Sequence, residues 1–464
     1  MTAQVSEQSP VRAAPRPRVR SRARGAAALA VIAGCNAMIQ LDDPIVNIAL
    51  PGMREGLGLS AVGASWVINA YLLTFGGLLL LGGRAGDILG RRKVFMTGVA
   101  LFTAAAALRG AAQSGEFLVA VRAVQGAGAA LAAPSGLALL LSTFAEGASR
   151  KRAIALCTTV GAVSTASGLL LAGALTSLSS WRWVLYLDVP LGLAIVLLAP
   201  FVLDETARHR GRFDLTGALL SALGAACLVY GLAQAAERPL SDPVVVGCVL
   251  GGVVLLAVFA AVERRAQQPI VVPRLFADRD RLLAYLGTLA VPGALIGTYF
   301  FLNQYFQNQH GWSALSTAWA LLPLPVTMAV MAVAAVRLER RIGARRLWAA
   351  GAALLVTGNL WLSTLSAGDG YAGTVLPALV LLGGGMAFCV LPPTVLATSG
   401  LRGDEAGAAA SMLNSLQSVG GSIGLAALVT VSSHSGGMTG GFATGAAFAG
   451  CALLAALFLR HRSE

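Results

Sequence analysis

Long apolar segments separated by short polar connections run from residue 26 to residue 459. A helix needs about 20 apolar residues to cross a bilayer, and fourteen segments approach or exceed that length. Because a backbone in lipid must satisfy its own hydrogen bonds, each segment is predicted to be a helix. The predicted crossings are 26–50, 62–82, 94–112, 117–143, 153–176, 183–203, 214–235, 243–262, 282–306, 314–336, 347–366, 372–397, 406–431 and 440–459.

The composition leads to the same fold class. Of the 464 residues, 56% are hydrophobic and 12% are charged, whereas an ordinary soluble domain carries about 25% charged residues. The sequence therefore predicts an all-α polytopic membrane protein and excludes a soluble fold. The net charge of +13 comes from short basic clusters between the apolar segments. We therefore expect the chain to bind no nucleic acid.

The basic residues predict the orientation of the helices. If the N-terminus is cytoplasmic, 29 of the 34 Lys and Arg residues fall on the cytoplasmic side. Such an excess is typical of cytoplasmic loops, and one crossing more or fewer would destroy it. We expect a multi-pass protein of the bacterial cytoplasmic membrane with both termini in the cytoplasm. The five remaining basic residues are Arg54, Arg109, Arg122, Arg182 and Arg238.

Two segments indicate an internal repeat. One reads GRAGDILGRRKVFMTGVALF from Gly83, and the other reads VRLERRIGARRLWAAGAALL from Val336, so that Gly90 aligns with Gly343. Both lie between crossings on the same predicted side, which indicates a parallel repeat of six-helix bundles, an architecture found in secondary transporters. The predicted domains are a disordered cytoplasmic tail (1–25), an N-terminal six-helix bundle (26–204), two inserted transmembrane helices with a cytoplasmic linker (205–281) and a C-terminal six-helix bundle (282–464).

The segment GRAGDILGRRK that begins at Gly83 resembles the loop signature G-x-L-x-D-x-x-G-R-R/K of the major facilitator superfamily. Asp87 is expected near the start of the third helix, where a negative charge is favoured, and Arg91 is expected to pair with it. In that family the loop is thought to latch the two bundles in one state. The alternative is a charged loop that only fixes the topology. The resemblance implies a latch formed by Gly83, Asp87, Gly90, Arg91 and Arg92.

Three further motifs resemble those of the fourteen-helix drug:proton antiporters in this superfamily. They are LDDPIVNIALP (41–51), VRAVQGAGAALAAP (121–134) and WRWVLYLDVPLG (181–192). The resemblance implies two six-helix bundles plus two inserted helices, alternating access, and a proton gradient as the energy source. We expect no cofactor, and no metal-binding constellation is visible in the sequence.

The fifth crossing departs from the motif of this family. The family has Gly-Pro followed by Gly-Gly, but this chain reads Gly168-Leu-Leu-Leu-Ala-Gly173 and lacks the proline and its kink. Gly161, Gly168 and Gly173 still predict a face that packs closely on a neighbouring helix. The direction of transport therefore stays open at this point.

Three acids lie inside predicted crossings, namely Asp42, Asp43 and Asp188. An ionised carboxylate at the centre of a membrane helix costs roughly 2.5–3.5 kcal/mol. It must therefore face water, pair with a cation or bind a proton. Repulsion between neighbouring acids and burial both raise the affinity for a proton. We predict that these acids couple transport to protons. For Asp42 and Asp43 the alternative is that they lie at the outer end of the helix, in contact with water. For Asp188 the alternative is a capping or packing role.

Nearby residues extend this hypothesis. The resemblance gives Arg122 a role in proton transfer, with Gln125 on the same helix face three residues later. The alternative is that Arg122 extends its side chain outward to water. Arg109 is given no function and is expected to reach water or an acid such as Glu116. Pro44 has no N–H, so the carbonyl of Gln40 is expected to be free for water or a ligand.

Uncharged polar residues in the crossings are the candidates for substrate binding. They are Asn36, Gln40, Gln125, Gln304, Gln307, Asn414 and Gln417. The alternative for Gln304 and Gln307 is contact with water outside the membrane, and for Asn414 and Gln417 it is hydrogen bonding between helices.

The sequence favours a proton-coupled secondary transporter that exports small hydrophobic or cationic molecules, as in drug or antibiotic efflux. Its expected partners are the substrate, protons and the lipid bilayer, and we expect a monomer. An importer of the same fold remains open, because a fold does not settle direction. An enzyme that acts on lipid-linked substrates is the third hypothesis, although the loops are short and the four histidines are scattered.

Overall fold

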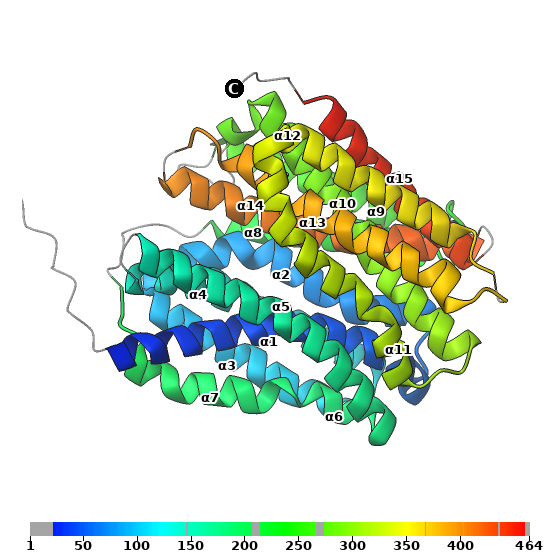
Figure 1. The fold of residues 1–464 in the computed structure, drawn as a ribbon, viewed down its shortest axis with the longest axis horizontal. Coiled ribbons are helices and arrows are strands. Elements are labelled where there is room, and N and C mark those ends of the chain that lie inside the picture. The colour runs from blue at the N-terminus through cyan, green and yellow to red at the C-terminus, as the bar shows by residue number, and fades with distance from the viewer. Residues whose placement is uncertain are drawn as a thin grey trace, which may run out of the picture.

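The computed structural model describes residues 22–144, 147–206, 214–265, 273–366, 368–401, 403–434 and 437–459. Every element in these ranges is a helix, and the helices pack side by side into an elongated bundle (Figure 1). The predicted all-α fold is therefore confirmed. Most of the predicted tail, residues 1–21, lies outside the described residues.

The first half of the chain forms a bundle of its own. Its elements are α1 (Arg22–Leu57), α2 (Ala61–Leu89), α3 (Arg91–Gly110), α4 (Gly115–Thr143), α5 (Ala148–Leu178), α6 (Trp181–Leu185) and α7 (Asp188–Val202). The sixth predicted crossing is thus divided into a short helix and a longer one. The inserted helices are α8 (Leu215–Gln234) and α9 (Pro243–Arg265).

The second half completes the molecule. Its elements are η1 (Pro273–Phe276), α10 (Arg279–Gln304), η2 (Tyr305–Gln309), α11 (Ala314–Leu321), α12 (Pro323–Ser363), η3 (Tyr371–Val375), α13 (Leu376–Thr398), α14 (Gly403–His434) and α15 (Met438–Leu457). The start of α1, at the left of Figure 1, and the end of α15, at the top beside the C-terminus label, lie at the same end of the helix bundle. We call this the terminal end and the other the opposite end.

Among the described residues, thirteen helical segments are long and apolar enough to cross a membrane. One of them, Ala314–Ser363, has 50 residues and covers two of the predicted crossings. It turns at Gly343, whose φ of 81° and ψ of 159° are not helical. The tenth and eleventh predicted crossings are therefore joined through a single glycine rather than through a separate loop.

The same turn occurs in the first half. Gly90, which the sequence repeat aligns with Gly343, separates α2 from α3 with a φ of 106° and a ψ of 126°. Glycine adopts positive φ readily because it has no Cβ. The two halves therefore share a backbone feature at the position where their sequences are most alike.

Replacing Gly343 by alanine is expected to lower the free energy of unfolding by about 1–3 kcal/mol, the cost of a residue with a Cβ in this backbone region, which glycine alone adopts readily. A Cβ there meets no atom within 4 Å, so the effect isolates backbone strain. Gly247→Ala is the matched control, since a Cβ at this helical glycine also meets nothing within 4 Å. Thermal unfolding in detergent measures both variants. Equal midpoints for the two would contradict the assigned turn.

Small residues bring helices together as the fifth-crossing glycines predicted. A Cβ at Gly168 would lie 3.0 Å from a methyl of Leu41 on α1, and one at Gly173 would lie 2.7 Å from Ala318 on α11. Helix α5 therefore packs closely on α1 and reaches α11 of the second half.

The inserted helix α8 spans the seam between the two halves. It packs against both α2 and α14, and the Thr430 hydroxyl on α14 donates a hydrogen bond to the carbonyl of Leu232 on α8. The inserted pair α8 and α9 is thus attached to the side of the molecule where α2 and α14 meet (Figure 1).

Candidate functional site

Four charged side chains from four helices meet inside the first half. They are Asp42 on α1, Arg109 on α3, Arg122 on α4 and Asp188 on α7, and each is at most 1% exposed. Their formal charges cancel, with two carboxylates and two guanidinium groups. Buried charges are tolerated when they are paired and hydrogen-bonded. We call this set, together with the fully buried Gln125, the charge cluster.

Arg109 lies between the two acids. Its Nη1 pairs with Asp42 and its Nη2 with Asp188. Nη1 also donates to Oε1 of Gln125 at 3.0 Å. The guanidinium donates further to the carbonyl of Leu185, at 3.3 Å from Nη2 and 3.4 Å from Nε. One side chain of α3 therefore holds α1, α6 and α7 together.

The break between α6 and α7 explains two of these contacts. Leu185 is the last residue of α6, where helical carbonyls run out of backbone donors. Asp188 is the first residue of α7, where the helix dipole favours a negative charge. Asp188 is thus both ion-paired and placed at a helix start, and its role in proton coupling stays a prediction.

Arg122 holds Asp42 from the other side. Its Nη1 donates to Oδ2 of Asp42 at 2.5 Å and to Gln125 at 2.9 Å, and its Nε donates to the carbonyl of Val67 at 2.9 Å. Its guanidinium carbon lies 4.4 Å from the centre of the Tyr71 ring, within the range of a cation–π contact. Gln125 donates to Oδ1 of Asp42 at 3.0 Å. Both oxygens of Asp42 are therefore bound by donors.

Of the two alternatives for Arg109, contact with an acid is confirmed, although the acids are Asp42 and Asp188 rather than Glu116. The Arg109 side chain is fully buried rather than reaching water, and Glu116 is exposed in the first turn of α4. The missed signal was charge balance. Crossings 1 and 6 hold three acids, and with only Arg122 assigned to them two acids were left without a counter-ion. An arginine within a membrane segment is itself costly unless it is paired.

Asp43 lies outside the charge cluster. Consecutive helix residues point about 100° apart, and the side chain of Asp43 is exposed whereas that of Asp42 is not. Asn36, Gln40, Asp43 and Asn47 follow one another at intervals of four, three and four residues, which places them on one face of α1. We call these four residues the polar stripe.

Pro44 interrupts the hydrogen bonds of α1 without ending the helix. The carbonyl of Gln40, which was expected to be free for water or a ligand, accepts a hydrogen bond from the Thr165 hydroxyl of α5 at 3.5 Å. The same hydroxyl also donates to the carbonyl of Gly161 at 3.1 Å. The carbonyl freed by the proline is therefore partly used to join α1 to α5.

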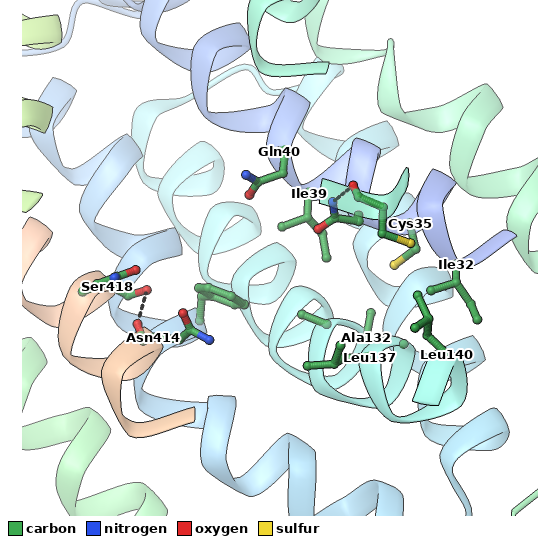
Figure 2. A pocket seen from close by; sticks show the side chains of 15 residues that line it. Ile32, Cys35, Ile39, Gln40, Ala132, Leu137, Leu140, Asn414 and Ser418 are labelled. Atoms are coloured by element: carbon green, nitrogen blue, oxygen red, sulfur yellow. Dashed lines mark hydrogen bonds between the residues drawn. The ribbon is translucent and has the colours of Figure 1, made fainter. Parts of the chain in front are cut away.

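A cavity of about 310 Å³ lies between the two halves. On the first-half side it is lined by Asn36 and Gln40 together with apolar residues of α1, α2 and α4, and on the other side by Asn414 and Gln417 of α14. Figure 2 shows Gln40 across the cavity from Asn414. The lining residues of α1 belong to its first half and those of α4 to its second half, so the cavity lies towards the terminal end.

The other candidates for substrate binding lie elsewhere. Gln125 is inside the charge cluster. Gln304 accepts a hydrogen bond from Arg54 at 3.2 Å, and Gln307 donates to the carbonyl of Ile48 at 3.2 Å. Both contacts cross between the halves near the end of α1, at the opposite end of the molecule.

Two more contacts close the opposite end. Asn303 on α10 donates to the carbonyl of Asn47 on α1, and the backbone N–H of Leu315 donates to the Ser177 hydroxyl at 3.0 Å. The halves are therefore joined at the opposite end. Nearer the terminal end the cavity separates α1 and α4 from α14, whereas α2 and α14 remain in contact there, with the Ser415 hydroxyl donating to the carbonyl of Gly76 at 2.8 Å.

The loop between α2 and α3 holds the residues of the predicted latch. Asp87 pairs with Arg91 at 2.9 Å, as predicted, but it belongs to the last turn of α2. The acid at the start of α3 is instead Glu205, which accepts a hydrogen bond from the N–H of Arg92 at 3.0 Å. The Arg92 side chain donates to the carbonyl of Leu203 at 3.2 Å. These contacts tie the loop to the segment after α7, within the same half.

The remaining latch glycines lie beside these contacts. A Cβ at Gly83 would lie 3.7 Å from Pro134 of α4, and one at Gly90 would lie 2.7 Å from the Glu205 carboxylate. Glycine at position 90 thus allows Glu205 to approach the start of α3.

A family model described as Major Facilitator Superfamily matches residues 32–425. The chain belongs to this superfamily. It is 39% identical to the cephamycin export protein of Amycolatopsis lactamdurans over 414 residues, covering 87% of this chain and 85% of that protein. It is also 39% identical to the puromycin resistance protein of Streptomyces alboniger over 409 residues, covering 87% and 81% of the two chains.

Solved structures share the fold of this superfamily member. A peptide transporter in complex with sulfate aligns with a TM-score of 0.69 at 15% identity, covering 93% of each chain. The nucleoside transporter NupG aligns with a TM-score of 0.68 at 11% identity, covering 93% of this chain and 98% of that one. The family, the relatives and the fold together identify a multi-pass membrane transporter of small molecules.

Proposed function

We propose that this superfamily member is a proton-coupled exporter of small hydrophobic or cationic molecules, such as drugs or antibiotics. It acts as a monomer in the bacterial cytoplasmic membrane with both termini in the cytoplasm. The observation that carries the proposal is the buried, charge-balanced cluster of Asp42, Arg109, Arg122 and Asp188. The polar stripe lies on a neighbouring face of α1, and two of its residues, Asn36 and Gln40, line the cavity between the halves.

The relatives favour export over import. Proteins of 39% identity are described as a cephamycin export protein and a puromycin resistance protein. A third relative, 33% identical over 394 residues, is a tetracenomycin C resistance and export protein of Streptomyces glaucescens. Removal of an antibiotic from the cell serves resistance, whereas uptake would oppose it.

The geometry suits a state that loads substrate from the cytoplasm. With the terminal end in the cytoplasm, the cavity lies on the cytoplasmic side and the contacts of Gln304 and Gln307 close the outer side. Protonation of Asp42 or Asp188 would leave the charge cluster with a net charge of +1. Arg109 would then lose one of its two ionic contacts with α1 and α7. This loss changes the relative free energies of the two states of alternating access, one open to the cytoplasm and the other open to the outside.

Transport by purified protein in liposomes with an imposed pH gradient tests the proposal. Puromycin is a suitable probe because it carries an amine and because a relative of 39% identity is described as a puromycin resistance protein. We expect puromycin to move against the direction of proton flow, and nigericin, which dissipates the pH gradient, to stop this movement. Movement at the same rate with and without the gradient would exclude proton coupling.

Replacing Asp87 by asparagine tests the latch. The change removes the ion pair with Arg91 and is expected to slow turnover about tenfold, which equals about 1.4 kcal/mol in activation free energy. Substrate affinity is expected to stay within twofold, because Asp87 lies outside the cavity lining. Initial transport rates and equilibrium binding separate the two quantities. The exposed Glu55, replaced by glutamine, is the control, and wild-type turnover in Asp87→Asn would remove the latch assignment.

A further inference from the structure

Helix α1 contains a second proline close to the opposite end. Pro51 lies inside the helix and has no N–H, so the carbonyl of Asn47, four residues earlier, has no donor at position 51. The proline ring also clashes with that carbonyl and turns it away from the helix axis. A membrane helix tolerates a carbonyl freed in this way when a neighbouring helix supplies a donor. At this point α1 therefore depends on a donor from another element.

The donor comes from the other half of the molecule. Nδ2 of Asn303 on α10 donates to the carbonyl of Asn47, and the Asn303 side chain is only 1% exposed. Its Oδ1 accepts from Nε2 of Gln307 at 2.6 Å, and the same nitrogen of Gln307 donates to the carbonyl of Ile48 at 3.2 Å. Two amides of the second half are thus joined to each other and to consecutive carbonyls of α1.

The backbone of the second half presents both amides to α1. Asn303 and Gln307 lie on either side of the junction between α10 and η2, which is a π-helical turn. The N–H of His310 donates to the carbonyl of Tyr305 at 3.2 Å and closes this wider turn. Single π-helical turns are rare and are frequent at functional sites. Because residues four apart are neighbours on a helix surface, the two amides point the same way.

The end of α1 belongs to the first half. Just beyond the proline, Trp181 of α6 packs on α1, so that a Cβ at Gly52 would lie 3.2 Å and one at Gly56 3.0 Å from its ring. The carbonyl of Asn47 is therefore held by the first half, and its donor Asn303 by the second. The hydrogen bond between them exists only while the halves are together at the opposite end. When the halves separate there, water replaces the amide.

The other proline of α1 is satisfied differently. Pro44 frees the carbonyl of Gln40, which accepts from the Thr165 hydroxyl of α5. Helix α5 belongs to the same half as α1, so this donor is independent of the contact between the halves. Of the two carbonyls that prolines free in α1, only the one freed by Pro51 depends on the other half.

We propose that Pro51 and Asn303 are positioning residues for transport. Pro51 presents the carbonyl of Asn47, and Asn303 binds this carbonyl only in the state that is closed at the opposite end. The net stabilisation is that of one hydrogen bond, which is small enough to be reversed in every transport cycle. This inference rests on the alternating access of the proposed function, but not on proton coupling or on the direction of transport.

Distances between spin labels on the two halves test the proposal. Glu55→Cys on α1 and Gln309→Cys in η2 carry the labels at the opposite end, and Lys93→Cys and Arg340→Cys carry them at the terminal end. All four positions are exposed. Double electron–electron resonance is measured on the full-length protein in lipid nanodiscs, after the six native cysteines have been replaced by alanine.

Pro51→Ala supplies an N–H that returns the carbonyl of Asn47 to the hydrogen bonds of its own helix. We expect the ratio of long to short distances at the opposite end to rise about two- to tenfold, the effect of one net hydrogen bond. Asn303→Leu removes the donor and is expected to give a rise of the same size. The distance at the terminal end shortens in both variants, which a purely local loosening of α1 would not produce.

Pro44→Ala is the matched control, because it also adds an N–H to α1 but acts on a carbonyl whose donor lies in the same half. We expect it to leave both distance distributions unchanged. Pro51→Ala combined with Asn303→Leu is expected to shift the ratio no further than Asn303→Leu alone, since both act on one contact. The proposal is overturned if Pro51→Ala keeps the wild-type ratio, if the two effects multiply, or if Pro44→Ala gives the same shift.

These outcomes are distinguishable from those of the proposed function. If the distances shift as expected but no compound moves with a pH gradient, the roles of Pro51 and Asn303 stand and proton-coupled export fails. If gradient-driven export of puromycin proceeds while Pro51→Ala keeps the wild-type distances, export stands and the roles of Pro51 and Asn303 fail.

Discussion

Replacing Arg109 by glutamine is expected to lower the free energy of unfolding by about 3–5 kcal/mol, the usual cost of removing one partner of a buried ion pair. The change removes the ion pair of Asp188 and leaves Asp42 paired with Arg122 alone, at positions without contact with water. The carbonyl of Leu185 also loses its donors. Thermal unfolding in detergent measures the loss, and gradient-driven transport is expected to disappear with it.

A second substitution distinguishes charge balance from simple loss of packing. Asp188→Asn alone leaves the charge cluster with a net charge of +1, but combined with Arg109→Gln it restores a net charge of zero. We expect the double variant to be more stable than the sum of the single effects predicts, with a coupling energy of about 0.5–3 kcal/mol for residues in contact. Strict additivity would show that the two side chains act independently and would contradict the bridging role of Arg109.

Replacing Asp42 by asparagine is expected to abolish gradient-driven transport, with a loss of at least about tenfold or roughly 1.4 kcal/mol. The amide nearly matches the carboxylate in shape but can neither take up a proton nor carry the charge that holds Arg109 and Arg122. Transport in liposomes with and without an imposed pH gradient measures the effect.

Exchange of labelled for unlabelled puromycin across the membrane, without any gradient, serves as the control. Exchange needs the cavity and the movement of the two halves but no net proton flow. We therefore expect Asp42→Asn to retain exchange while it loses uphill transport. Full gradient-driven transport in this variant would rule out Asp42 as the coupling residue and leave Asp43 and Asp188 as candidates.

The helices could be predicted closely because membrane insertion is a local requirement. Each crossing needs its own run of apolar residues, whatever its neighbours do. The predicted crossings 62–82 and 243–262 correspond to α2 (Ala61–Leu89) and α9 (Pro243–Arg265). The interruption of the sixth crossing between α6 and α7 was missed, because a break inside an apolar run has little effect on its hydropathy.

The candidate site was less predictable because its geometry depends on residues far apart in the chain. The spacing of Arg122 and Gln125 on one helix face was visible in the sequence, and the structure brings both to Asp42. The partners of Arg109 could not be recognised in the sequence, because Asp42 and Asp188 are 67 and 79 residues away from it. No local pattern reveals which of several acids an arginine will meet.

The sequence by itself determined the fold class, the helix positions and the presence of costly charges in the membrane, since each follows from transferring a short segment from water to lipid. Only the tertiary structure decided which charges pair with one another, that Asp42 is enclosed while Asp43 is exposed, and that the cavity lies between α1 and α14. These features depend on how helices rotate and pack against one another. Packing is set by many side chains at once rather than by any one segment.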